Sequence, residues 1–495
     1  IVEKLNGMWA FCLHDSSKNL LFLSRDRFGE KPLYYAYHNH RFLFASELRP
    51  IEHFPGFVSQ TSNLALSKYL GHGYIPAPYS LIKGVFKLSA GTNLLFDTKS
   101  HKIRLHRYWR FNLEPDAPGE KNESFYREGL LSHLEDSVKL RLVSDVPLGT
   151  FLSGGIDSST VSVLAKKFIP ELKTFSIGFS EKSFDETQYS QEVSNLIGTE
   201  HHSKVCRDSD LLEMSQELAT HLDEPIADSS IIGSYLLCKF ARKEVKVTLG
   251  GDGADELLAG YDPFKAIRMA QFMDKFTSSD VINNLCKSFH NLMPVSHKNM
   301  SLDFKIKKFL DGMKNPWESR HPAWLSPLTV EEIREVLGVT FSREEIYSEA
   351  IETWNHSPQE NLIEKSLDFY TNIYLQNGIL AKLDRASMLN SLEVRSPFLD
   401  INFVNFVRKI PTYLKYNKGI SKFILKKSVD NLLPQEIINR KKKGFGVPIG
   451  KWFKEGKLPS GIFSSRFKKY FSEHQRGQKD HRLLLWAEFL LQNRA

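Results

Sequence analysis

The pattern that most constrains the fold begins near residue 146, where short apolar strands start to alternate with amphipathic helices. Strands are predicted at 146–152, 174–179 and 245–249, and helices at 158–167, 186–196 and 229–241. Strands joined by helices form right-handed βαβ crossovers, so the strands are parallel and helices cover both faces of their sheet. The sequence therefore predicts an α/β fold with a doubly wound parallel sheet, and a largely helical region after Tyr261.

The first hundred or so residues follow another pattern, in which short apolar runs alternate with turn residues. Such runs lie at 9–14, 20–23, 33–37 and 42–45. The segment Pro-Asp-Ala-Pro-Gly at 115–119 is typical of a linker, and a long amphipathic helix is predicted after it, at 123–142. We therefore expect a β-rich domain at 1–114 and a second domain at 121–495.

A glycine-rich run separates the first predicted strand of the parallel sheet from its helix. Its residues are Ser153, Gly154, Gly155, Ile156, Asp157, Ser158 and Ser159. Paired glycines let the backbone bring its N–H groups against a polyphosphate, and the helix that follows directs its positive end to the same anion. No Lys precedes the serines as the Walker pattern requires, so kinase-like transfer of the γ-phosphate is disfavoured. A glycine-rich helix cap without a ligand is the alternative.

Composition argues against several other classes of protein. The chain has 66 basic and 58 acidic residues, a net charge of +8, and its basic run is confined to 440–443, so we expect no nucleic-acid partner. Its four cysteines are far apart, which argues against a disulfide scaffold or zinc cluster and favours a cytoplasmic location. No run reaches roughly eighteen apolar residues, so no membrane partner is expected. The oligomeric state stays open, with a homodimer as one alternative.

Further motifs follow the glycine-rich run in a fixed order. Together they lie at 152–159, 174–179, 222–225, 250–257, 386–388, 393–400 and 442–448. In this order they resemble the glutamine-hydrolysing asparagine synthetase family, and the likeness covers nearly the whole chain. The first motif is similar to the pyrophosphate loop of ATP pyrophosphatases, which cut ATP between its α and β phosphates. The resemblance implies a synthetase domain of the ATP pyrophosphatase type at 121–495.

The resemblance also implies an ATP site with a bound Mg²⁺ ion. The expected nucleotide-binding residues are Leu152, Ser153, Gly154, Gly155, Asp157, Ser158, Ser159, Ile177, Gly250 and Gly251. Asp157 and Asp255 follow predicted strands, where open α/β sheets bind ligands, and the family likeness assigns both to Mg²⁺. A helix N-cap is the alternative for either carboxylate. Plain sheet packing is the alternative for Leu152, Ile177 and Gly251.

Two residues are expected to take part in the chemistry. In the family, the Lys two places before a Gly-Phe pair neutralises charge between the α-phosphate and the departing pyrophosphate, and here it is Lys442. Gly444 and Gly446 suggest a loop that closes over the site, although a basic run is usually a solvated face. Asp252 stands where the family commonly has Glu, which is thought to align or deprotonate the amine. The shorter side chain keeps the carboxylate and leaves the acceptor substrate open.

Charged side chains near the same strand end are expected to hold the acceptor. Glu256, Arg385 and Arg395 match positions near the family's proposed aspartate site, and an Arg can hold a carboxylate with two hydrogen bonds. Structural ion pairing is the alternative for Arg395. The resemblance thus implies ATP, Mg²⁺, aspartate and ammonia or glutamine as ligands, with an aspartyl-adenylate as intermediate.

The N-terminal region resembles the latter part of the family's N-terminal nucleophile glutaminase, an αββα domain. The similar segments are 7–11, 25–35 and 44–48. In that domain a terminal Cys attacks glutamine, whereas this sequence starts with Ile1, so we expect a partial domain and an activity with ammonia alone. Asp26 matches the carboxylate that binds the α-amino group of glutamine, and an ion pair in an Arg-Asp-Arg turn is its alternative.

Other functions remain open beside asparagine synthesis. Relatives with the same chemistry amidate sugar acids or peptides or close β-lactam rings, and a fold does not select the acceptor. A non-catalytic nucleotide-binding relative is a second rival, although Asp157, Asp255 and Lys442 argue against it. A nucleic-acid-modifying relative is a weaker third, because it would need an added RNA-binding domain.

Overall fold

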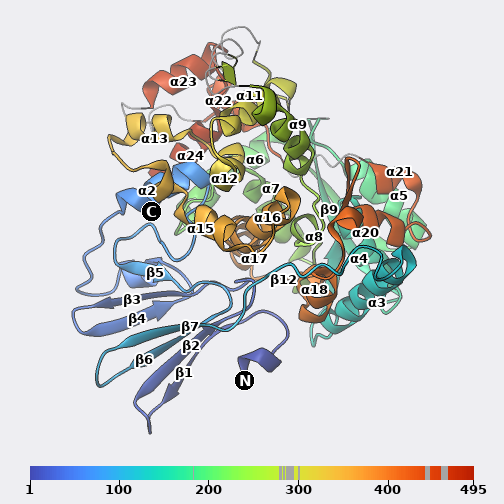
Figure 1. The fold of residues 1–495 in the computed structure, drawn as a ribbon, viewed down its shortest axis with the longest axis horizontal. Coiled ribbons are helices and arrows are strands. Elements are labelled where there is room, and N and C mark those ends of the chain that lie inside the picture. The colour runs from blue at the N-terminus through green and yellow to red at the C-terminus, as the bar shows by residue number, and fades with distance from the viewer. Residues whose placement is uncertain are drawn as a thin grey trace.

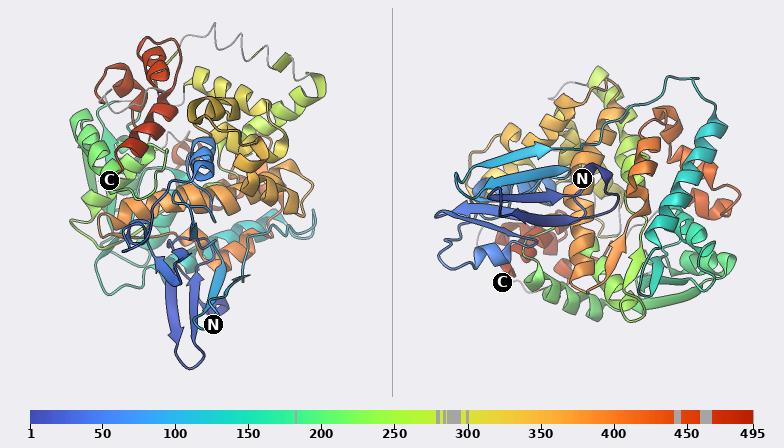
Figure 2. Two further views of the ribbon diagram at one scale, coloured as in Figure 1. Left: turned by 90° about the vertical axis from the view of Figure 1, so that its left-hand side faces the viewer. Right: turned by 90° about the horizontal axis from the view of Figure 1, so that it is seen from below.

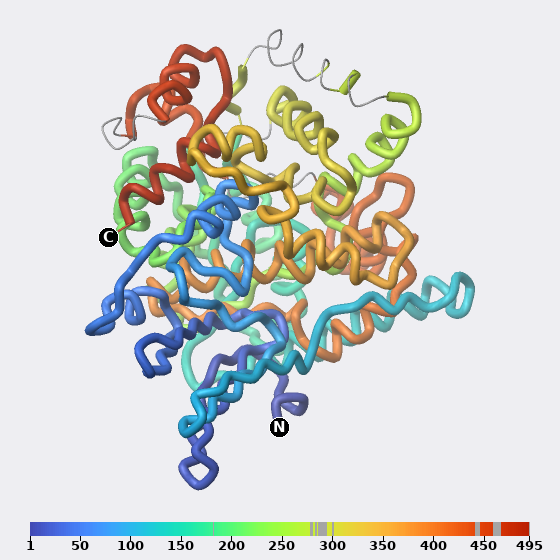
Figure 3. The backbone as a smooth tube through the Cα atoms, turned by 60° about the vertical axis from the view of Figure 1, so that its left-hand side comes forward, coloured from blue at the N-terminus to red at the C-terminus, as the bar shows by residue number. Residues whose placement is uncertain are grey.

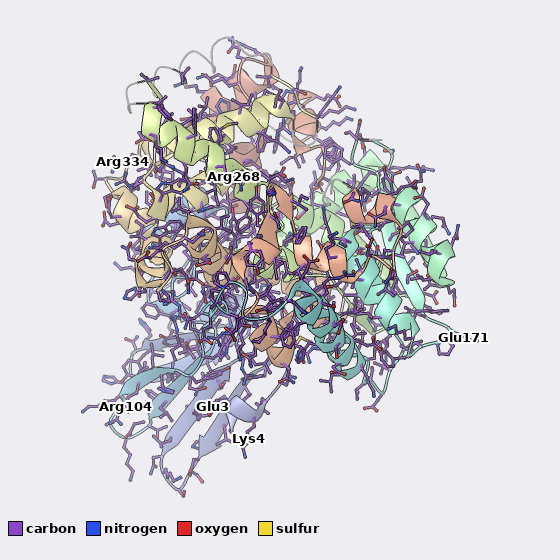
Figure 4. The ribbon with its side chains drawn as sticks, turned by 45° about the vertical axis from the view of Figure 1, so that its right-hand side comes forward. Glu3, Lys4, Arg104, Glu171, Arg268 and Arg334 are labelled. Atoms are coloured by element: carbon purple, nitrogen blue, oxygen red, sulfur yellow. The ribbon has the colours of Figure 1, made fainter. Side chains whose placement is uncertain are left out.

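The computed structural model shows a sheet-rich N-terminal part beside a larger body of helices that surround a second sheet (Figure 1). This order of β-rich, α/β and helical regions agrees with the prediction from sequence. Charged side chains such as Arg104, Glu171 and Arg334 lie at the edges of the molecule (Figure 4). The structure describes residues 1–181, 183–277, 281–282, 285, 295–298, 301–440, 446–458 and 467–494.

The N-terminal part contains two antiparallel sheets, ordered β1-β2-β6-β7 and β4-β3-β5. Their strands are β1 Ala10–Asp15, β2 Leu20–Arg25, β3 Tyr34–His38, β4 Arg41–Ala45, β5 Val85–Lys87, β6 Thr92–Asp97 and β7 Ile103–Arg107. Leu23, Tyr35 and Leu94 are buried in a core that both sheets share. Across it the Phe42 and Phe96 rings stack with centroids 4.3 Å apart. The four apolar runs seen in the sequence correspond to β1 to β4.

The second sheet has five parallel strands in the order β10-β9-β8-β11-β12. They are β8 Leu148–Phe151, β9 Lys173–Phe179, β10 Glu200–Cys206, β11 Val247–Leu249 and β12 Glu393–Arg395. From β8 the chain runs outward through β9 to β10 and returns to the other side of β8 as β11. The strand order therefore reverses between β8 and β11, and open α/β sheets bind ligands at the carboxyl ends of strands at such a reversal.

Helices cover both faces of this sheet, as the alternating pattern predicted. They are α3 Glu123–Arg141, α4 Ile156–Lys166, α5 Thr187–Ile197, α6 Asp208–His221 and α7 Ser230–Ala241. Leu152 and Leu249 belong to the core on the face of α3 and α4. Phe175 and Ile177 belong to the core on the face of α6 and α7.

The rest of the chain is mostly helical and completes the body around the sheet. Its elements are α8 Ala254–Leu257, α9 Asp262–Phe276, α11 Leu302–Met313, α12 Trp317–Leu325, α13 Val330–Leu337, α14 Arg343–Ile346, α15 Ser348–His356, α16 Leu362–Phe369, the π-helix η2 Tyr370–Ile379, α17 Leu380–Met388, α18 Ile401–Val407, α19 Thr412–Lys415, β13 Tyr416–Asn417, β14 Ile420–Ser421, α20 Phe423–Ser428, α21 Gln435–Asn439, α22 Ile449–Lys454, α23 Lys468–Gln475 and α24 Arg482–Gln492. Among the described residues, no helix combines the length and the apolar character needed to cross a bilayer.

One helix of the N-terminal part is embedded in the helical body. After the short α1 (Arg49–Glu52), α2 (Asn63–His72) lies among helices of the C-terminal half, as Figures 2 and 3 show from two directions. Lys68 of α2 is fully buried, and its Nζ donates to Glu349 Oε2 at 2.8 Å. The Tyr69 hydroxyl donates to the Ala487 carbonyl of α24 at 3.1 Å. These buried contacts join the two parts of the chain.

Candidate active site at the carboxyl edge of the parallel sheet

Two glycine-containing loops meet where the strand order reverses. Loop 152–155 joins β8 to α4, and loop 250–253 joins β11 to α8. A Cβ added to Gly251 would lie 2.9 Å from Asp157 Cβ and 3.0 Å from the Ser158 nitrogen. The loop after β11 therefore touches the glycine-rich run at the first turn of α4, and a side chain at position 251 would push the two apart.

The glycine-rich loop is shaped by hydrogen bonds between its own serines. The Ser153 amide donates to Ser158 Oγ at 3.1 Å, and the two hydroxyl oxygens lie 3.0 Å apart. Gly154 has a φ of 68°, and a Cβ there would lie 2.5 Å from Tyr189 Cβ, so this position requires glycine. Gly155 is the N-cap of α4, whose N-terminal end favours an anion.

Asp157 and Asp255 reach the same cation, which sequence reasoning did not identify. Lys422 Nζ lies 2.7 and 2.6 Å from the two carboxylate oxygens of Asp157 and 2.6 Å from Asp255 Oδ1. Only 6% of the Lys422 side chain is exposed, against 9% for Asp157 and 11% for Asp255. Two buried carboxylates that share one cation supply the oxygen ligands and the short separation that Mg²⁺ requires. The residues present therefore fit a magnesium site.

A small pocket lies beside the glycine-rich loop, at the carboxyl end of β9. It is lined by Ser153, Ser176, Ile177, Phe179, Phe184, Glu186 and Ser190. Its lining thus combines the apolar Ile177, Phe179 and Phe184 with serine hydroxyls and the Glu186 carboxylate. Leu152 is buried in the core, and its amide donates to the Phe175 carbonyl at 2.9 Å, so its predicted contact with the nucleotide stays a prediction. Ser159 is also fully buried, and its hydroxyl has no hydrogen-bond partner among the described residues.

Glu256 follows directly after Asp255 and is buried against a group of tyrosines. The Tyr261 hydroxyl donates a short hydrogen bond to Glu256 Oε1. Burial, and then the charge of Asp255, raises the pKa of Glu256 to about 7. The ring centroid of Tyr261 lies 5.1 Å from that of Tyr370 and 5.6 Å from that of Tyr374, both on the π-helix η2. Such π segments are rare and often occur at functional sites.

A second cation that sequence reasoning missed lies near these tyrosines. Lys382 of α17 donates from Nζ to Asp228 Oδ2 at 2.7 Å and to Ser230 Oγ at 2.8 Å. Burial raises the pKa of Tyr374, and the nearby charges of Asp228 and Glu256 raise it further. Asp228 and Ser230 thus hold the Lys382 ammonium at the start of α17.

Two family models match the chain. The asparagine synthase model matches residues 129–488, and the glutamine amidotransferase domain model matches residues 1–109. The chain belongs to the asparagine synthase family. It is therefore a ligase-type enzyme of that family, which uses ATP as a substrate.

Curated relatives extend the match along most of the chain. Asparagine synthetase 1 (glutamine-hydrolysing) of Bacillus subtilis is 32% identical over 457 residues, which cover 91% of this chain and 69% of that protein. A putative asparagine synthetase 2 of Methanocaldococcus jannaschii is 36% identical over 400 residues, which cover 78% of this chain and 73% of that protein. Amidase chry2 of Gibberella zeae is 24% identical over 492 residues, which cover 91% of this chain and 71% of that protein. Relatives of this chain thus carry different names for their activity.

Within this asparagine synthase chain, two residues predicted to bind substrate already have protein partners. Arg385 forms ion pairs of 3.2 Å with Asp223 and 3.5 Å with Glu47. Asp26 is fully buried and accepts hydrogen bonds of 2.9 to 3.2 Å from the backbone amides of Trp9, Phe28, Glu30 and Lys31. These contacts order the turn after β2, where the alternative prediction was an ion pair. The proposed contacts of Arg385 with aspartate and of Asp26 with glutamine stay predictions.

The remaining residues predicted for this asparagine synthase site are Asp252, Arg395 and Lys442. A Cβ on Gly250 would lie 2.7 Å from Asp252 Oδ2, so the Asp252 carboxylate turns back over the loop after β11. Arg395 forms an ion pair of 2.7 Å with Glu393, which is the structural alternative considered for it. Lys442, expected to act in catalysis, lies outside the described residues.

Proposed function

We propose that the chain uses ATP to activate the side-chain carboxylate of aspartate and transfers it to ammonia, forming asparagine. The observation that carries this proposal is the meeting of the two loops at the strand-order reversal, with Asp157 and Asp255 directed at one shared cation. The loop geometry suits a polyphosphate, and the nucleoside is proposed to lie on the adjacent side of Ile177. Membership of the asparagine synthase family supports the same chemistry.

In the proposed first step, an acceptor carboxylate oxygen bonds to the α-phosphorus of ATP, and the bond to the bridging oxygen breaks to release pyrophosphate. The glycine-rich loop and the N-terminus of α4 bind the phosphates, and the pocket beside Ile177 holds the nucleoside in line. Mg²⁺ held by Asp157 and Asp255 would neutralise phosphate charge. Lys442 is proposed to stabilise the charge that develops on the departing pyrophosphate.

In the proposed second step, the ammonia nitrogen attacks the acyl carbon of the adenylate, and AMP leaves with the electrons of the broken bond. Asp252 is proposed to align the amine or to take its surplus proton. Glu256 and Arg385 are proposed to orient aspartate, although Arg385 would have to share its guanidinium with Asp223. The nitrogen is proposed to come from added ammonia or, through the glutamine amidotransferase domain, from glutamine.

A second candidate keeps the chemistry and changes the acceptor to a sugar acid or a peptide carboxylate. Two observations favour it: Asp252 replaces the expected Glu beside the amine site, and relatives at 24–25% identity carry the name amidase. A fold does not select the acceptor, so both candidates are compatible with the same loops and carboxylates.

The deciding experiment measures pyrophosphate release from Mg-ATP and ammonium chloride with aspartate present or absent. We expect release that depends on aspartate, with asparagine formed in equal amount. Asp255→Asn is expected to reduce turnover by about a hundredfold. Asp262→Asn removes a half-exposed carboxylate of α9 and should leave turnover unchanged. Release that ignores aspartate but responds to another carboxylate would select the second candidate.

A further inference from the structure

The ammonium of Lys422 occupies the position between the two carboxylates that fit a metal. Its Nζ lies 2.6 to 2.7 Å from three oxygens of Asp157 and Asp255. Those distances are as short as strong charge-assisted hydrogen bonds. A divalent cation that bridges the same oxygens needs the same volume, so ammonium and metal exclude each other there.

The backbone around Lys422 is built to deliver its ammonium to this point. Lys422 has a left-handed φ of 53°, and its amide donates to the Leu258 carbonyl at 3.1 Å. Gly260 leaves the space for the side chain, because a Cβ there would lie 2.2 Å from Lys422 Cε and 1.9 Å from Asp255 Oδ1. The lysine and the second carboxylate are therefore packed together against one glycine.

The charge of Lys422 at this position opposes the binding of a metal ion. All three charged side chains are buried, and like charges repel more strongly there than in water. The two carboxylates alone would attract a free divalent cation. With the ammonium in place, a metal ion entering the site meets a positive charge at contact distance.

We propose that Lys422 keeps free divalent cations out of the site until a nucleotide arrives, so that the metal enters only together with the triphosphate. The metal and the displaced ammonium together carry more positive charge than the two carboxylates can neutralise, and the phosphates supply the additional negative charge. This inference rests on the proposed function only in taking a nucleoside triphosphate as the ligand. It assigns to Lys422 the order in which metal and nucleotide bind.

Binding of Mn²⁺ to the nucleotide-free protein tests the proposal, with free Mn²⁺ measured by electron paramagnetic resonance. Wild-type protein is expected to bind Mn²⁺ weakly. Lys422→Met keeps the length of the side chain without its charge and should tighten Mn²⁺ binding by about tenfold or more. Lys427→Met, at an exposed position of the helix that follows Lys422, is the matched control and should leave the affinity unchanged. Equal affinity in wild type and Lys422→Met would overturn the proposal.

Without the ammonium, two buried carboxylates lie together, and their repulsion destabilises Lys422→Met. A second substitution, Lys422→Gln, is therefore made in parallel, because glutamine still donates hydrogen bonds to the carboxylates. Each is melted with and without Mn²⁺, and a rise in melting temperature with Mn²⁺ that exceeds the wild-type rise supports the proposal. If neither variant folds, the wild type decides. Tight Mn²⁺ binding by nucleotide-free wild type that disappears in Asp255→Asn would refute exclusion by Lys422, and weak binding supports it. None of these measurements needs turnover, so failure of the aspartate assay leaves them interpretable.

Discussion

Arg440 donates a hydrogen bond of 2.6 Å from Nη1 to Glu186 Oε1, at the pocket beside the glycine-rich loop. Its guanidinium carbon also lies 4.4 Å from the centroid of the Tyr189 ring. The Arg440 side chain is 6% exposed and that of Glu186 is 12% exposed. This buried pair ties the end of α21 to the start of α5 across the proposed nucleotide site.

We expect Arg440→Met and Glu186→Gln each to lower the free energy of unfolding by about 3 kcal/mol, because each leaves a buried polar partner uncompensated. The double variant should lose clearly less than the sum of the two. Urea unfolding of the four proteins measures this coupling. Additive losses would show that the contact contributes nothing specific.

Gly251→Ala should weaken nucleotide binding by forcing the two loops apart. Its Cβ would approach Asp157 Cβ to 2.9 Å and the Ser158 nitrogen to 3.0 Å, and backbone atoms must shift to accept it. We expect the dissociation constant of a non-hydrolysable ATP analogue to rise about tenfold, because the displaced backbone no longer holds the phosphates in the right geometry. Calorimetric titration measures it, with the far-ultraviolet spectrum as a check on folding. Unchanged affinity would contradict the close approach of the loops.

The stability of the chain should depend on pH through Glu256, whose pKa is raised from 4.5 to about 7 chiefly by burial. Between these values the folded state keeps a proton that the unfolded state has lost, so stability falls as pH rises from about 4.5 to about 7. Glu256→Gln removes this dependence. Relative to wild type, it should gain about 3 kcal/mol across that interval, measured by urea unfolding at several pH values. A difference that does not vary with pH would contradict the raised pKa.

The buried ion pair between Lys68 and Glu349 should couple the N-terminal part to the helical body. The side chains are 0% and 10% exposed, and the ammonium also donates to Ser348 Oγ at 2.7 Å. Lys68→Met is expected to lower the free energy of unfolding by about 3–5 kcal/mol. Lys18→Met removes an exposed lysine of the N-terminal part and should change stability by less than about 0.5 kcal/mol. Comparable effects of the two substitutions would argue against coupling through α2.

The architecture followed well from sequence because its signals are local. Alternation of apolar runs located β8, β9 and β11 to within two residues, and glycines marked the loops after β8 and β11. The strand β10 escaped notice because Glu200–Cys206 is an edge strand whose side chains are mostly exposed and polar. The π-helix η2 was not distinguished either, since its apolar spacing is close to that of an α-helix.

The charged partners of the site had no local signal. Lys422 stands in no motif and approaches Asp157 from 265 positions away, so only the folded chain brings them together. Lys382 lies three residues before Arg385, yet the former pairs with Asp228 and the latter with Asp223. The direction in which each side chain leaves α17 therefore determines whether it pairs with Asp228 or with Asp223. Sequence pattern alone did not contain that information.

The distance along the chain between Lys422 and its carboxylates has a consequence for biosynthesis. Asp157 and Asp255 leave the ribosome long before the lysine that neutralises them, because synthesis runs from the N-terminus. A nascent chain that has not yet reached residue 422 therefore carries this pair of acids without the lysine as counter-charge. Docking of the α20 segment is the event that brings this counter-charge to the acids.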